Sequence, residues 1–123
     1  MTVVLVLVGG AIGAPLRYLT DLFVQSHHDS VFPWGTISVN VGGSLLLGVV
    51  AGAVSTGDFP VWVLTLVGTG FCGALTTFST FGFETIRLIE DGSLLEAFLN
   101  GFVSLTLGLA ACAGGWAAAA SLA

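Results

Sequence analysis

Charged residues divide this chain into four long uncharged stretches. These stretches cover residues 1–16, 30–57, 59–83 and 97–123. A membrane-spanning helix needs about 20 predominantly apolar residues, so three stretches are long enough, and the first is long enough if Arg17 and Asp21 lie near its far end. Only 7% of residues are charged and the mean hydropathy is +1.05, whereas about a quarter of residues in a soluble domain are charged. The sequence therefore predicts an all-α membrane protein with four transmembrane helices.

The four predicted helices form a single transmembrane domain over residues 1–123. Their expected bounds are about 3–24, 35–54, 60–89 and 94–119. The loops between them are short and contain the Pro, Asp, Ser and Gly that are typical of turns. We expect His27 and His28 beside Asp29 in the first loop, as solvated side chains, because two adjacent histidines and one carboxylate do not converge as metal ligands do.

Small residues recur at a spacing of four along the predicted helices, as in the pairs Gly9 and Gly13, and Gly48 and Gly52. Faces of small residues let helix backbones approach closely in lipid, so these pairs predict helix-packing seams. Four short helices do not easily surround an aqueous path alone. The sequence therefore favours a homo-oligomer, most simply a dimer.

The third predicted helix is interrupted by polar residues in the middle of its uncharged stretch. Its run Gly-Ala-Leu-Thr-Thr-Phe-Ser-Thr extends from Gly73 to Thr80. Thr and Ser compete for backbone partners and Gly weakens a helix, so we expect the chain to unwind there. Unwound backbone at membrane depth is tolerated only where it lines a cavity or contacts an ion. The functional centre is therefore expected at this break.

The placement of charges excludes several classes of function. Proton-coupled transporters carry a carboxylate or histidine at mid-depth, whereas Glu84 and Arg17 lie near the ends of their helices. The sequence contains no nucleotide loop, no Ser-His-Asp arrangement and no HExxH motif, so enzyme activity has no support. The net charge of −5 comes from loop acids, and without a basic patch we expect no nucleic-acid partner.

Neutral polar side chains remain as candidates for chemistry. Asn40 must face protein or water, because an unpaired amide in hydrocarbon costs several kcal/mol, and both an interhelical hydrogen bond and a pore-lining role satisfy this requirement. Asn100 and Ser104 are four residues apart and predict one polar stripe along the last helix. Such a stripe suits a track of donors for an anion.

Phe78 and Phe81 are three residues apart and share a face if helix resumes after the break. Aromatic rings have a positive edge, so two rings presented edge-on can help replace the hydration of a small anion. Core packing is the alternative role for this pair.

Together these motifs resemble the Fluc (CrcB) fluoride channels. The resemblance covers all four helices in order. It rests on GGAIGAPLRY at 9–18, WGTISVNVGGS at 34–44, GFCGALTTFSTF at 70–81, and Glu84. The chain departs from the family at Asn100, where many members have an aromatic residue, and at Gly108, where a further hydroxyl is expected.

The resemblance implies a multi-pass protein of the plasma membrane that exports fluoride passively. It further implies an antiparallel, dual-topology homodimer, or a dimer with a paralogous partner, with two fluoride pores and a structural sodium ion at the interface. The implied fluoride-pore residues are Asn40, Phe78, Phe81, Thr77, Ser79, Ser104 and Thr106. The implied sodium ligands are the backbone carbonyls of Gly73 and Thr76, with Arg17 near the pore mouth and Glu84 near a vestibule.

Two other functions fit a chain of this size. Four-helix multidrug transporters share the length and the dual topology but require a membrane-embedded Glu in the first helix, and residues 1–16 contain none. A non-transporting assembly subunit is the other alternative, with the polar residues serving only as packing contacts. The only basic side chains, Arg17 and Arg87, fall toward one membrane face, which is a weak bias that permits insertion in both orientations.

Overall fold

A computed structural model describes residues 1–27 and 32–122 of the chain. All regular structure in these ranges is helical, in the order α1 (Thr2–His27), α2 (Trp34–Ser55), α3 (Val61–Val63), η1 (Leu64–Cys72), α4 (Gly73–Leu75), α5 (Ser79–Glu90) and α6 (Leu94–Ser121). Within the described residues four stretches are long and apolar enough to cross a membrane: Thr2–His27, Trp34–Ser55, Val61–Glu90 and Leu94–Ser121. The prediction of an all-α, multi-pass membrane protein with four spanning helices is confirmed.

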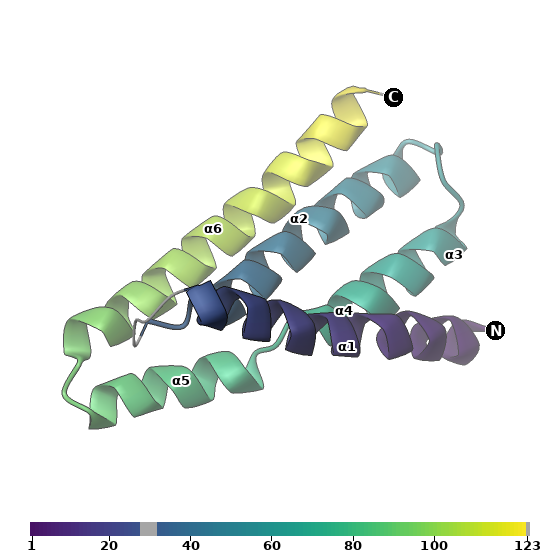
Figure 1. Cartoon of the computed structure of the whole chain (residues 1–123). Coiled ribbons are helices and arrows are strands. Elements are labelled where there is room, and N and C mark those ends of the chain that lie inside the picture. Colours follow the sequence, from purple (N-terminus) through teal and green to yellow (C-terminus); the bar gives the residue numbers. More distant parts are fainter. Residues whose placement is uncertain (28–31, 123) are drawn as a thin grey trace.

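The helices α2 and α6 form the most extensive pairing and run side by side in the same direction (Figure 1). Their contact is a seam of small residues. A Cβ added to Gly52 would lie 2.6 Å from the carbonyl oxygen of Trp116, and one on Gly115 would lie 2.6 Å from that of Leu45. No side chain fits at these positions, so the backbones meet directly.

A second seam joins α1 to η1. Gly9 and Gly13 face the backbone of Leu66 and Phe71 so closely that a Cβ at either glycine would overlap it. The predicted packing roles of Gly9, Gly13, Gly48 and Gly52 are therefore confirmed.

The segment η1 is a π-helix of nine residues, where the sequence had predicted α-helix. π-Helical turns are rare and occur mostly at functional sites. Two of its residues, Gly68 and Gly70, are buried glycines, and the close approach of Gly70 to Val6 of α1 accompanies the wider turn.

The chain leaves helical geometry between α4 and α5. α4 ends at Leu75, Thr76 adopts an extended conformation (φ −80°, ψ 159°), and α5 begins at Ser79. Gly73 itself is helical, so the irregular stretch is shorter than the expected 73–80. The third span thus consists of α3, η1 and α4 on one side of segment 76–78 and α5 on the other, with a non-helical connection between them (Figure 1).

α1 is about one turn longer than predicted. His27 was expected in a loop but is the exposed last residue of α1, and its ring packs on Phe23 at a centroid distance of 4.5 Å. Its Nδ1 and the Ser26 hydroxyl both lie within hydrogen-bond distance of the Phe23 carbonyl, which extends the helix end. His28 and Asp29 lie outside the described residues.

The turns that follow α2 and α5 share one geometry. Gly57 and Gly92 have φ values of 87° and 80°. Asp58 N donates to Ala53 O and Ser93 N donates to Leu88 O. Each turn is therefore a helix-terminating motif in which glycine takes the left-handed position, and this lets short loops return the chain into the next span.

Candidate functional site

Asn40 of α2 pairs with the backbone of the irregular segment. Its Nδ2 donates to the carbonyl oxygen of Thr77 at 3.0 Å, and its Oδ1 accepts from the amide of Thr77 at 2.7 Å. One side-chain amide thus replaces the helical partners that Thr77 lacks. The interhelical hydrogen bond left open for Asn40 is therefore present. Nδ2 carries a second hydrogen that this pair does not use.

Arg17 contacts the same segment from α1. Its Nη1 donates to the carbonyl oxygen of Thr76 at 3.4 Å. The pairing of Arg17 with Asp21 that i,i+4 spacing suggests is replaced by this contact, and Asp21 instead packs against Gly35 at the start of α2. Both α1 and α2 therefore hold the segment by side-chain hydrogen bonds.

The Thr77 hydroxyl organises the start of α5. It accepts a hydrogen bond from Thr80 N at 3.1 Å and donates to Thr80 Oγ1 at 3.1 Å. A hydroxyl that accepts from an amide three residues later is the geometry of a helix N-cap. Thr77 is buried and acts in this way as both the anchor of the segment and the cap of the following helix.

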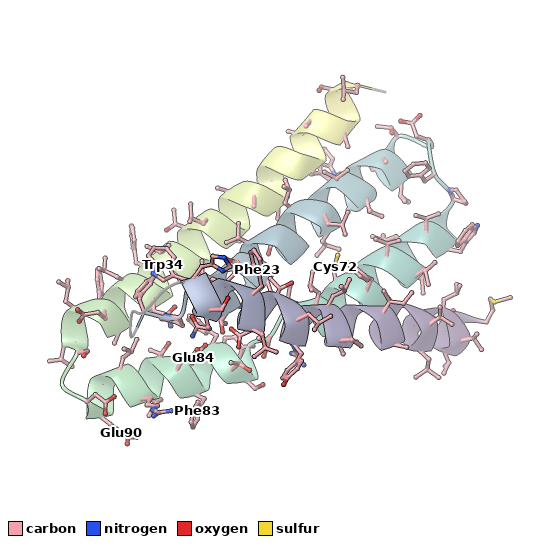
Figure 2. All side chains as sticks on the ribbon, viewed as in Figure 1. Phe23, Trp34, Cys72, Phe83, Glu84 and Glu90 are labelled. Carbon is pink, nitrogen blue, oxygen red and sulfur yellow. The ribbon has the colours of Figure 1, made fainter. Side chains whose placement is uncertain are left out.

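A groove of 340 Å³ opens beside this segment. Its walls come from α2, η1, α4, segment 76–78, α5 and α6. The predicted residues that line it are Asn40, Gly73, Thr76, Thr77, Phe78, Phe81 and Ser104. Cys72, the last residue of η1, also lines the groove (Figure 2). Segments far apart in the sequence therefore converge on one cavity.

The hydroxyl groups in the groove donate to nearby protein acceptors. Ser44 Oγ donates to the carbonyl of Asn40 at 2.7 Å, and Ser104 Oγ donates to Asn100 Oδ1 at 3.4 Å. A hydroxyl can rotate its proton to a new acceptor. An anion in the groove therefore has the spare Asn40 hydrogen directly available and reaches these hydroxyls after they rotate.

The two phenylalanines contact each other at the groove. Their ring centroids are 5.7 Å apart with planes inclined by 43°. This confirms that Phe78 and Phe81 share a face. Phe81 is half-buried, whereas Phe78 is 83% exposed in the single chain and projects beyond the groove wall.

A second cavity of 220 Å³ lies beyond Thr77, which lines both cavities. It is lined by Arg17, Tyr18, Asp21, Thr36 and Thr80, among others. Glu84 lies close by, on the side of α5 that faces α2, and accepts a hydrogen bond from Thr36 (Figure 2). A guanidinium, a carboxylate and several hydroxyls thus line the cavity on the other side of Thr77.

Two predicted pore residues lie outside the groove in the single chain. Ser79 and Thr106 are both exposed. Thr106 follows Ser104 by two residues, which rotates its side chain about 200° around α6.

Gly73 and Thr76 offer backbone carbonyls of the kind that hard cations bind. The amide four residues after Gly73 belongs to Thr77 and donates to Asn40, so the Gly73 carbonyl lacks its α-helical donor. Gly73 is also exposed, with open space at its Cβ position. The Thr76 carbonyl already accepts from Arg17. The donor chemistry therefore fits a sodium ion at Gly73, and at Thr76 the ion would share its ligand with a guanidinium.

Sequence reasoning missed Thr85. Asn100 pairs with Ser104 as expected of the polar stripe, but it is fully buried outside the groove and donates from Nδ2 to Thr85 Oγ1 at 2.8 Å. One feature of the sequence could have drawn attention to Thr85. It follows Phe81 by four residues, so in a helix its hydroxyl can donate to the Phe81 carbonyl, as it does here.

Comparison with known proteins gives a consistent result. The family described as "CrcB-like protein, Camphor Resistance (CrcB)" matches residues 4–116. The chain is similar to "Fluoride-specific ion channel FluC 1" of Frankia casuarinae, with 58% identity over 90% of this chain and 92% of the relative. It is 52% identical to the protein of that name from Streptomyces avermitilis, over 98% of both chains. The corresponding protein of Nocardia farcinica is 51% identical over 90% of this chain and 75% of the relative.

Proposed function

Because this chain belongs to the CrcB-like family, we propose that it is a passive, fluoride-selective ion channel that lets cytoplasmic fluoride leave across the plasma membrane. The observation that carries the proposal is the groove at segment 76–78, where an amide, hydroxyls and two phenyl rings meet. The family is one of ion channels and not of enzymes, and its relatives named above are fluoride-specific channels.

Fluoride is small and strongly hydrated, so a selective path has to supply compensating donors in a narrow space. In the groove these donors are the second Nδ2 hydrogen of Asn40, the rotatable hydroxyls of Ser44 and Ser104, and the positive ring edges of Phe78 and Phe81. The described lining residues include no carboxylate and no histidine. This composition supports conduction down a gradient rather than proton-coupled transport.

The second cavity serves as the approach to this path. Arg17 supplies an attractive potential for anions at the pore mouth. Thr77 is shared by both cavities and forms the passage between them. Ser79 and Thr106 extend the polar track, and Glu84 lies at the vestibule.

The functional unit is an antiparallel dimer with two pores, each lined by both subunits. Support comes from Phe78, which is 83% exposed in one chain although it borders the groove. An exposed ring at an open groove is suited to contribute to a wall that a second subunit completes. In this arrangement the third span is broken at the depth of the membrane, where the irregular backbone is covered by protein and lines a cavity.

The Gly73 and Thr76 carbonyls of both subunits would hold a sodium ion at the dimer interface, and its positive charge would stabilise the two irregular segments beside each other. The Gly73 carbonyl, which lacks its helical donor, supports this role.

Fluoride efflux from liposomes that contain the purified protein tests the proposed function. We expect electrogenic fluoride flux well above that of protein-free vesicles, with much slower chloride flux. Silent vesicles, or equal rates for the two halides, would refute a fluoride-selective channel. Fluoride-independent proton uptake driven by an organic cation would favour the multidrug-transporter alternative instead.

A further inference from the structure

Asn100 is the most deeply buried side chain that the proposed ion path does not use. It is 0% exposed in α6 and lies outside the groove. Both ends of its amide are bonded: Nδ2 donates to Thr85 Oγ1 at 2.8 Å, and Oδ1 accepts from Ser104 Oγ at 3.4 Å. One residue therefore joins α5 to a hydroxyl that lines the groove.

The hydrogen-bond chain continues from Thr85 to the other wall of the groove. The Thr85 hydroxyl donates to the carbonyl oxygen of Phe81 at 2.8 Å while it accepts from Asn100. Ser104 and Phe81, at the two ends of this chain, both line the groove. Only a side chain with a donor and an acceptor at separate ends, such as Asn, fits between them.

α5 is not continuous with the helix before it, so contacts with neighbouring helices have to set its orientation. It is a 12-residue helix that follows the irregular segment 76–78. Among the described residues, side-chain hydrogen bonds join it to other helices at two points: Thr36 of α2 donates to Glu84, and Asn100 of α6 donates to Thr85. The second bond acts one turn from Phe81 and so sets where that ring stands relative to α6.

We infer that Asn100 is a positioning residue for the ion path: through Thr85 it holds Phe81 at the groove wall, and through its Oδ1 it orients the Ser104 hydroxyl. This inference rests on the proposed function. Interhelical hydrogen bonds in membranes have strengths that correspond to about a 3- to 20-fold change in an equilibrium. Loss of the tie is therefore expected to lower fluoride flux by about 3- to 20-fold.

A double-mutant cycle separates positioning from simple structural support. Thr85→Val removes the hydroxyl at nearly constant shape and leaves Asn100 Nδ2 buried without its partner, so both thermal stability and flux fall. Asn100→Leu added to Thr85→Val removes the unpaired amide, so stability recovers while flux stays low. Thr85→Ser keeps the hydroxyl and retains flux near that of the wild type. Thr2→Val, at an exposed position at the start of α1, is the matched control.

The measurements are fluoride efflux per reconstituted protein and the melting temperature of the purified protein in detergent. Recovery of flux together with stability in the double variant would overturn the inference, as would flux in Thr85→Val equal to that of Thr2→Val. If the Asn100→Leu variants do not fold, the contrast between Thr85→Val and Thr85→Ser decides: equal flux in these two overturns the inference. Failure of the proposed function shows separately, as absent flux in the wild-type protein.

Discussion

At the residue scale, one amide has two tasks. Asn40 holds the backbone of Thr77 with two hydrogen bonds and keeps one N–H directed to other partners. The same residue type thus stabilises the irregular backbone and offers a neutral donor to an anion. A neutral donor is suited to a conducting site, because a full positive charge would retain the ion.

Asn40→Asp tests this double role. The carboxylate cannot donate to the Thr77 carbonyl, which leaves a buried acceptor without its partner at a cost of about 1 to 3 kcal/mol, and it places negative charge in an anion path. We expect fluoride flux to fall about tenfold to hundredfold in liposome efflux. Gln25→Glu makes the same chemical change at an exposed position of α1 and should leave flux unchanged. Equal flux in the two variants would contradict the assignment of Asn40.

Phe78 is the second residue with a distinct expectation. Phe78→Ile keeps an apolar side chain and removes the ring edge, whose interactions are worth about 0.5 to 1.5 kcal/mol, so flux should fall about 2- to 10-fold. Phe83→Ile is the matched control, because Phe83 lies in α5, five residues after Phe78, is 64% exposed and lies outside the groove (Figure 2). Efflux assays that show the same loss for both variants would assign Phe78 a general packing role.

At the element scale, two pairs of helices contact each other backbone to backbone at glycine positions. The seams between α2 and α6 and between α1 and η1 bring backbones together at glycines. This packing leaves two polar side chains of α2 facing the third span: Asn40 bonds the backbone of Thr77 in the irregular segment, and Thr36 donates to Glu84 of α5. Neighbouring helices therefore supply hydrogen-bond partners to the irregular segment.

Adjacent glycines of α6 provide a test of this packing. Gly115→Ala would place a Cβ 2.6 Å from the Leu45 carbonyl oxygen, whereas a Cβ at Gly114 meets no atom within 4 Å. Overpacking costs about 1 to 3 kcal/mol, so Gly115→Ala should lower the unfolding free energy measured in mixed detergent micelles. Gly114→Ala should cause no loss, since Ala favours helix over Gly by about 1 kcal/mol. Equal stabilities would show that the α2 and α6 backbones do not meet as described.

At the scale of the whole molecule, charge gives the chain little preference between its two orientations. Its basic side chains are Arg17 and Arg87, and Arg17 bonds the backbone of Thr76 inside the protein. The proposed antiparallel dimer uses this weak bias, because both orientations must be present in one membrane.

Cysteine labelling measures the orientation directly. In a background with Cys72→Ala and Cys112→Ala, single cysteines at Asp58→Cys and Asp91→Cys report the loops after α2 and α5, which lie at opposite ends of the third span. For dual topology, a membrane-impermeant maleimide should label about half of each variant in intact cells. Full labelling of one loop and none of the other would establish a single orientation and exclude the antiparallel dimer.

The sequence by itself determined the class of the protein and the place where its third span leaves helical geometry. Uncharged stretches of sufficient length predicted four spanning helices to within about one turn, because a bilayer leaves few alternatives to helix. The polar run after Gly73 located the irregular segment, since Thr and Ser weaken a helix wherever they cluster. The motifs around Asn40 and Phe78 indicated the family to which the chain belongs.

Only the tertiary structure decided which polar groups meet. The pairing of Asn40 with Thr77, the contact of Arg17 with Thr76 and the tie from Asn100 to Thr85 each join a helix to a different element of the chain. Such contacts depend on the rotation and depth of each helix, and these are set by glycine seams and by the π-helical turns of η1, which sequence periodicity does not predict. For the same reason Asn100, although it forms the expected pair with Ser104, lies buried outside the groove, while Thr106 faces away from the groove.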